Sequence, residues 1–173
     1  MERPGYEADK LHFNLYNRDS GETIPLTKDI DISFGGYTWD AQGKTIFADA
    51  DSDGEHKVFQ ISMSGHVKEA IPSLQNGGLT LIPGSNSSFV FLRNSMVSPN
   101  EIWTFNYEGG LVNKPKQITF ENKKSLEQFK WSQPEKIYFQ GSLDAKIQGY
   151  FLKPYGFDET KTWPLVVLIH GGY

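Results

Sequence analysis

Three glycines divide the first two thirds of this 173-residue sequence at equal intervals. Gly21, Gly65 and Gly109 are 44 residues apart, and each lies between two short runs of strand-forming residues. Glycine readily takes the left-handed backbone that tight hairpin turns require. Internal similarity at a period of roughly 20–50 residues is typical of repeat folds, whose units bury a core by stacking on their neighbours. The spacing therefore predicts a stacked array of β-hairpins.

The runs on either side of these glycines are predicted to pair, 11–16 with 23–27, 58–62 with 66–71, and 101–105 with 111–119. Two further sets of residues keep the same 44-residue spacing. One set is Leu15, Phe59 and Trp103, and the other is Phe47 and Phe91. Four short strands in such a period match one β-propeller blade. We therefore expect a mainly β fold that includes part of a β-propeller. A β-sandwich with coincident spacing is the alternative.

The repeat fails after the third hairpin. Residues 120–130 are polar and charged, and they predict a linker or a short helix. A new hairpin is then expected from 137–140 and 147–152. The run 163–169 is apolar at successive positions, which suits a strand covered on both faces, as in an α/β sheet. We place a domain boundary near residue 130, with 1–130 as the C-terminal part of a propeller and 131–173 as the start of an α/β domain.

His170, Gly171 and Gly172 follow that apolar run directly. In α/β-hydrolases a His-Gly-Gly loop after a strand supplies a backbone N–H to the oxyanion hole. Glycine lets the backbone turn sharply and approach the developing charge closely. The nucleophile, acid and base follow this loop in such enzymes, and no Gly-x-Ser-x-Gly occurs in residues 1–173. We therefore predict that 131–173 are the start of an α/β-hydrolase domain, with an oxyanion loop here and no catalytic triad. An ordinary Gly-Gly turn is the alternative.

Composition excludes several other functions. The net charge is −4 and the isoelectric point about 5.6, so there is no basic footprint for nucleic acid. The longest strongly apolar run, 165–169, is too short to cross a membrane. The sequence has no cysteine, which rules out thiolate catalysis and cysteine-bound zinc.

Residues 49–54 match the first half of a calcium loop, but Gln60 stands where a bidentate Glu is needed. We interpret this segment as an Asp-Gly turn and predict no metal and no cofactor. His12, His56 and His66 lack metal-ligand spacing and are expected at polar surface positions. Arg93 could face a substrate carboxylate, but we expect it to solvate a strand edge.

The whole chain resembles the prolyl oligopeptidase family of serine peptidases, within it the acylaminoacyl-peptidase branch and its fungal dipeptidyl peptidases. The residues that carry this resemblance are spread over the sequence: 3–9, 95–100, 139–144, 148–154 and 163–172. The resemblance implies a two-domain enzyme in which a propeller shapes access to a hydrolase site that releases dipeptides from peptide substrates. Only His170, Gly171 and Gly172 carry over as site residues. Tyr173 departs from the family pattern, which usually has Pro at that position.

The resemblance also implies a secreted protein, with a cytoplasmic location as the alternative. It leaves the oligomeric state open. We expect the chain to be a fragment of the larger enzyme and inactive alone. The competing hypotheses are a non-catalytic propeller-type binding module and the product of a decayed gene.

Overall fold

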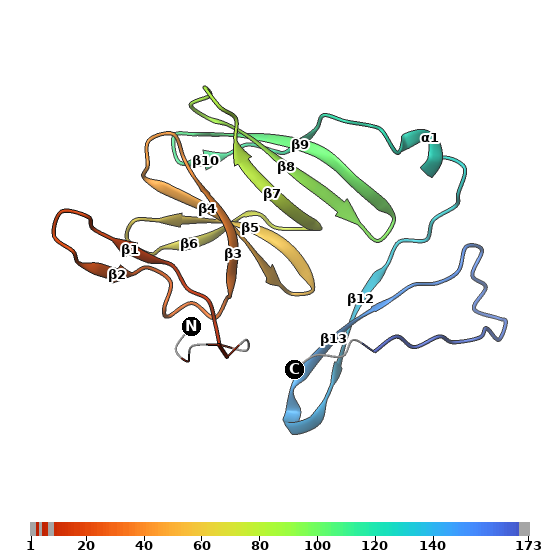
Figure 1. Ribbon diagram of the computed structural model, residues 1–173. Helices are drawn as coiled ribbons and strands as arrows, with labels where there is room; N and C mark the ends of the chain where they lie inside the picture. Colours follow the sequence, from red (N-terminus) through yellow and green to blue (C-terminus); the bar gives the residue numbers. More distant parts are fainter. Residues whose placement is uncertain (1–2, 4, 7–8, 170–173) are drawn as a thin grey trace.

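The computed structural model describes residues 3, 5–6 and 9–169, and it is built almost entirely of β-strands (Figure 1). A first hairpin pairs β1 (Asn14–Tyr16) with β2 (Thr23–Pro25). A four-stranded antiparallel unit follows, made of β3 (Phe34–Trp39), β4 (Thr45–Ser52), β5 (Glu55–Ser62) and β6 (Val67–Ile71).

A second antiparallel unit repeats this order. It consists of β7 (Gln75–Leu81), β8 (Ser88–Ser95) and β9 (Ser98–Glu108), with β10 (Leu111–Val112) and β11 (Lys116–Gln117) both paired to β9. The two units are joined into one nine-stranded sheet by a parallel contact of β5 with β7, which is limited to His56 and Gln75. The three hairpins predicted from the glycine spacing are thus confirmed.

Gly65 shows why the turn between β5 and β6 needs glycine. Its φ is +80°, and a Cβ placed on it would lie 2.5 Å from the carbonyl oxygen of Leu26. Leu26 follows strand β2, so the turn of one unit touches the hairpin that precedes it. A side chain at Gly65 would be strained by its backbone and would also separate the two hairpins.

Two apolar clusters lie on opposite faces of the first unit. One contains Phe34 and Phe59 and is covered by the β1–β2 hairpin, and the other joins Phe47 to Phe89, Phe91 and Phe105 of the second unit. Phe47 and Phe91, which the sequence places one period apart, are therefore both core residues between the two units. Stacking of the two units therefore buries apolar side chains that neither unit could bury alone.

The sheet ends before the predicted boundary near residue 130. A single helical turn, α1 (Lys123–Leu126), lies in the polar segment, and a separate hairpin then pairs β12 (Glu135–Gln140) with β13 (Lys146–Phe151). The linker and the hairpin are confirmed, whereas the division into two domains stays a prediction. Within the described part of the chain, no helix is long and apolar enough to cross a membrane.

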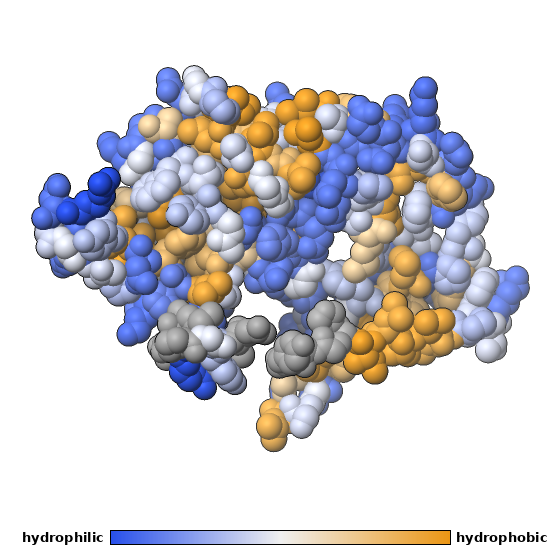
Figure 2. All heavy atoms as spheres, in the orientation of Figure 1, coloured by the Kyte–Doolittle hydropathy of each residue, from blue (hydrophilic) through white to orange (hydrophobic). Residues whose placement is uncertain are grey.

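The expectation of a buried strand at 163–169 is wrong for this structure. The segment forms no strand, and Leu165, Leu168 and Ile169 are 73%, 91% and 89% exposed. Trp163 packs on Phe157, but no described strand pairs with 165–169 and these residues stay exposed, whereas a buried strand needs both pairing and cover. Figure 2 shows the resulting hydrophobic surface at the C-terminal end of the described chain.

Candidate functional site: a polar joint between the sheet and the last hairpin

The tip of the β4–β5 hairpin is a two-residue turn formed by Asp53 and Gly54. Both residues have positive φ, 55° and 70°, and Ser52 pairs with Glu55 across the turn. Positive φ at both central positions is the type I′ geometry that favours the Asp-Gly sequence. The calcium-like segment is therefore a hairpin turn, as the sequence analysis proposed.

The carboxylates of this segment are held by donors from the protein itself. Asp49 accepts a hydrogen bond from the backbone N–H of Gly36 at 2.8 Å, and Asp51 lies 2.7 Å from Nδ1 of His56. Among the residues that the structure describes, no group of three His, Asp or Glu side chains is arranged to hold a metal ion.

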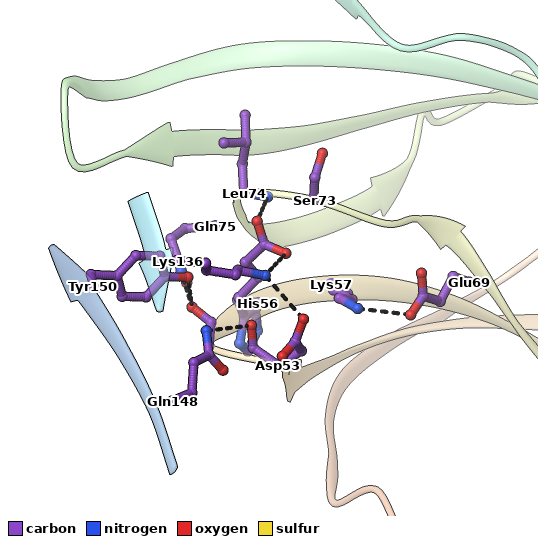
Figure 3. A network of polar contacts seen from close by, with 12 residues as sticks. Asp53, His56, Lys57, Glu69, Ser73, Leu74, Gln75, Lys136, Gln148 and Tyr150 are labelled. Atoms are coloured by element: carbon purple, nitrogen blue, oxygen red, sulfur yellow. Dashed lines mark hydrogen bonds and ion pairs between the residues drawn. The ribbon is translucent and has the colours of Figure 1, made fainter. Parts of the chain in front are cut away.

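The β12–β13 hairpin contacts the sheet through this same turn (Figure 3). Lys136 Nζ lies 3.1 Å from Asp53 and 3.0 Å from Glu55, and Tyr138 donates to Asp53 at 2.7 Å. From the other strand of the hairpin, Gln148 donates to the carbonyl oxygen of Asp53 and Tyr150 to that of Gly54, at 3.0 and 2.9 Å. We call this set of contacts the polar joint.

The residues of the joint are positioned by strand register. Lys136 pairs with Tyr150 and Tyr138 with Gln148, so the four side chains form two cross-strand pairs on one face of the hairpin. Side chains two residues apart on a strand share a face. The alternation of Lys136 with Tyr138, and of Gln148 with Tyr150, is a signal that the sequence analysis missed, because it marked the strands but not what their polar face would contact.

Electrostatics favour the ionised state of the joint. Burial disfavours the charge of Lys136, but its hydrogen bonds to Glu55 and Asp53 outweigh that cost, so the pKa of Lys136 lies above its ordinary value. The hydrogen bonds donated by Tyr138 and Lys136 lower the pKa of Asp53. The hydrogen bond that Tyr138 donates to Asp53 also raises the pKa of Tyr138. Near neutral pH Lys136 is therefore cationic and Asp53 anionic.

His56 extends this charged region into the sheet. Burial lowers its pKa, but the hydrogen bond to Asp51 and the charge of Asp49, 3.3 Å away, outweigh burial and raise the pKa of His56 above 6.5. The sequence predicted only a polar surface position for His56, whereas in the structure it is partly buried and lies against two carboxylates. His66 is exposed at the turn after Gly65, as expected.

Arg93 also differs from expectation. It lies on β8, between β7 and β9, and its side chain is half-buried. It is not a solvated edge residue, because strands pair on both sides of it. Burial lowers the pKa of the Arg93 guanidinium from its usual value.

His170, Gly171 and Gly172, the predicted oxyanion loop, lie outside the described residues. In the described part of the chain, no serine hydroxyl is hydrogen-bonded to a histidine ring. The charged residues here can hold two structural elements together, but they do not form a nucleophile and its base.

The fold of the described residues is that of a segment of acylaminoacyl peptidases. The peptidase of Pyrococcus horikoshii superposes with a TM-score of 0.66 and 18% identity over 87% of this chain and 22% of that chain. The chain is also similar to dipeptidyl-peptidase 5 of Schizosaccharomyces pombe, at 28% identity over 99% of this chain and 24% of the relative.

A second relative, dipeptidyl-peptidase 5 of Aspergillus fumigatus, is 28% identical over 96% of this chain and 23% of its own length. The chain thus spans about a quarter of the length of these relatives. No family model matches the chain. The resemblance to the prolyl oligopeptidase peptidases that the motifs indicate is confirmed by the relatives and by the fold.

Proposed function

We propose that residues 1–173 are the junction between the two domains of a serine peptidase. Residues 1–130 would be the C-terminal part of a β-propeller, and 131–173 the first strands of an α/β-hydrolase domain. The observation that carries this proposal is the similarity of nearly the whole chain to one quarter of dipeptidyl-peptidase 5. The two stacked antiparallel units and the separate β12–β13 hairpin support the division.

In the complete enzyme we propose hydrolysis of peptide bonds near the N-terminus through an acyl-enzyme. A serine would attack the peptide carbonyl, with a histidine as base and an aspartate orienting it. In α/β-hydrolases these groups follow the His-Gly-Gly loop. The backbone N–H groups of Gly171 and Gly172 would help bind the oxyanion, and residues 1–173 alone would be inactive.

The polar joint has a role in this scheme. By fixing the β12–β13 hairpin against the β4–β5 turn, it would set the position of the chain that leads to His170. Peptides are the proposed substrates, and one solved acylaminoacyl peptidase that this fold matches is in complex with Z-Gly-Gly-Phe-chloromethyl ketone. The family resemblance also supports secretion, which fractionation of the source cells would distinguish from a cytoplasmic location.

Labelling of the native protein tests the proposal. An antibody raised against residues 34–117 would isolate the product from its source, which is then treated with a fluorophosphonate probe and assayed on dipeptide substrates that end in Ala. We expect a labelled, active band about four times 19.6 kDa, since the chain spans 24% of its relative. The isolated 173-residue chain serves as the unlabelled control. A native product of 19.6 kDa that takes up no probe would contradict the proposal and favour a binding module.

A further inference from the structure

The guanidinium of Arg93 is held in place from two directions. Its Nε donates to Oδ1 of Asn76 at 2.7 Å, and its Cζ lies 4.7 Å from the ring centre of Trp103 and 5.3 Å from that of Phe91. Asn76 is 2% exposed and gives its amide hydrogens to the carbonyl oxygens of His56 and Ser73, both at 2.8 Å. The amide oxygen of Asn76 is thereby aimed at Arg93, so the guanidinium is preorganised.

The other edge of this guanidinium is unused by the described part of the chain. The one hydrogen bond of Arg93 to a described residue is donated by Nε, so its two terminal nitrogens have no such partner there. Glu101 of β9 is the cross-strand partner of Arg93, but its carboxylate accepts hydrogen bonds from Thr119 and Asn122 instead. Among the described residues, Gln60 Oε1 is the one fully buried side-chain polar atom without a hydrogen-bond partner. The terminal nitrogens of Arg93 also lack a partner, so they are not fully buried and solvent reaches them.

Arg93 lies near the end of the interior strand β8, on the side of the sheet where the polar joint lies. Asn76 and Arg93 are paired across β7 and β8, and the neighbouring Gln75 donates to the carbonyl oxygen of Gly54 at 3.3 Å. Gly54 in turn accepts the hydroxyl of Tyr150. Figure 1 shows the start of β7, the end of β8 and the β4–β5 turn on the side where β12 and β13 lie. The backbone of Arg93 therefore lies near the end of β8 that is on the same side of the sheet as the polar joint.

We propose that Arg93 binds a carboxylate of a peptide substrate through its two terminal nitrogens. This inference rests on the proposed peptidase function. A guanidinium presents parallel N–H groups that match a carboxylate bidentately, and a fixed, half-buried one spends little entropy in doing so. The carboxylate can come from the C-terminus of the peptide or from an acidic side chain.

Titration of the isotopically labelled 173-residue chain tests this without any catalysis. The Nε–H resonance of Arg93 and the side-chain amide of Asn76 are followed by NMR as four probes are added separately. The probes are an N-acetylated oligoalanine with a free C-terminal acid, its C-terminal amide, the amide with one internal Glu, and inorganic sulfate. The variants are Arg93→Met and Arg93→Lys, with the exposed Arg18→Met as the matched control, and far-UV circular dichroism verifies that each variant is folded.

We expect saturable shifts with the free acid and binding about tenfold weaker with the amide, since a charge-assisted pair is lost. Arg93→Met and Arg93→Lys should each weaken the acid by about the same factor, because lysine lacks the bidentate fork, whereas Arg18→Met should change nothing. Binding of the Glu-containing amide as tightly as the acid would support the proposal with a side-chain carboxylate as the source.

Equal affinity for acid and amide, or sulfate binding as tightly as the acid, would overturn the proposal. The acid and amide are compared on the unsubstituted chain, so the result stands even if a variant fails to fold. The titration requires no nucleophile. If no peptide binds in the titration but the native enzyme takes up the fluorophosphonate probe, only the Arg93 site is refuted. If the acid binds but the native protein takes up no probe, only the peptidase assignment is refuted.

Discussion

Phe47 joins the two halves of the large sheet, and its replacement tests whether those halves unfold together. Backbone pairing between the halves is limited to His56 and Gln75. Phe47 is fully buried, and its ring centre lies 4.9 Å from that of Phe89, 5.6 Å from Phe105 and 5.0 Å from Tyr107. The coupling between the halves therefore depends on side-chain packing.

Truncation of a buried phenylalanine costs about 3–5 kcal/mol in free energy of unfolding. Because three rings pack against Phe47, we expect Phe47→Ala at the upper end, about 4–5 kcal/mol. A domain has only about 5–15 kcal/mol of stability in total, so this variant would be barely folded. Phe47→Leu keeps most of the volume and should cost about 1–2 kcal/mol, which makes it the more measurable change.

Urea unfolding, followed by tryptophan fluorescence and by far-UV circular dichroism, measures these values. The unsubstituted chain should show one transition with coincident curves from both probes, and Phe47→Leu should shift its midpoint. Phe139→Leu, at a position 54% exposed on the last hairpin, is the control and should change stability by less than about 0.5 kcal/mol. Two separate transitions in the unsubstituted chain, or a loss below about 2 kcal/mol for Phe47→Ala, would refute this account of the core.

Two further predictions concern the charged residues. Lys136→Met should speed amide hydrogen exchange in β12 and β13 by a few-fold, since it removes both ion pairs of the polar joint. About 1 M salt should have a similar effect on the unsubstituted chain, because it screens these charges. Lys124→Met is the control, and unchanged exchange in Lys136→Met would show that the joint does not hold the hairpin. The raised pKa of His56 means that its protonated form stabilises the fold below about pH 6.5, and that this contribution is lost as the pH rises through the folded-state pKa. The stability difference between the unsubstituted chain and His56→Gln should therefore be larger at about pH 5.5 than at about pH 8. A difference that grows with pH would contradict the assignment.

The sequence predicted those features that depend on contacts within one repeat. The hairpins around Gly21, Gly65 and Gly109 formed as expected, because turn chemistry and strand alternation act over a few residues. Phe47 and Phe91 are both buried, as apolar positions in phase with the repeat suggest, but they meet in one cluster between the two units and reach it from opposite sides. The Asp53-Gly54 turn was preferred over a calcium loop for a similarly local reason, the missing ligand at Gln60.

Contacts between units could not be predicted in the same way. Lys136 meets Asp53 across more than eighty residues, and nothing in either segment specifies the other. Arg93 was assigned to an edge because its own segment does not reveal that strands flank it on both sides. The apolar run 165–169 has strand character, but a strand exists only where another pairs with it. Local sequence determined the turns, the strands and the repeat, and the tertiary structure alone decided which polar groups would meet, because pairing and burial are properties of neighbours that are distant in the chain.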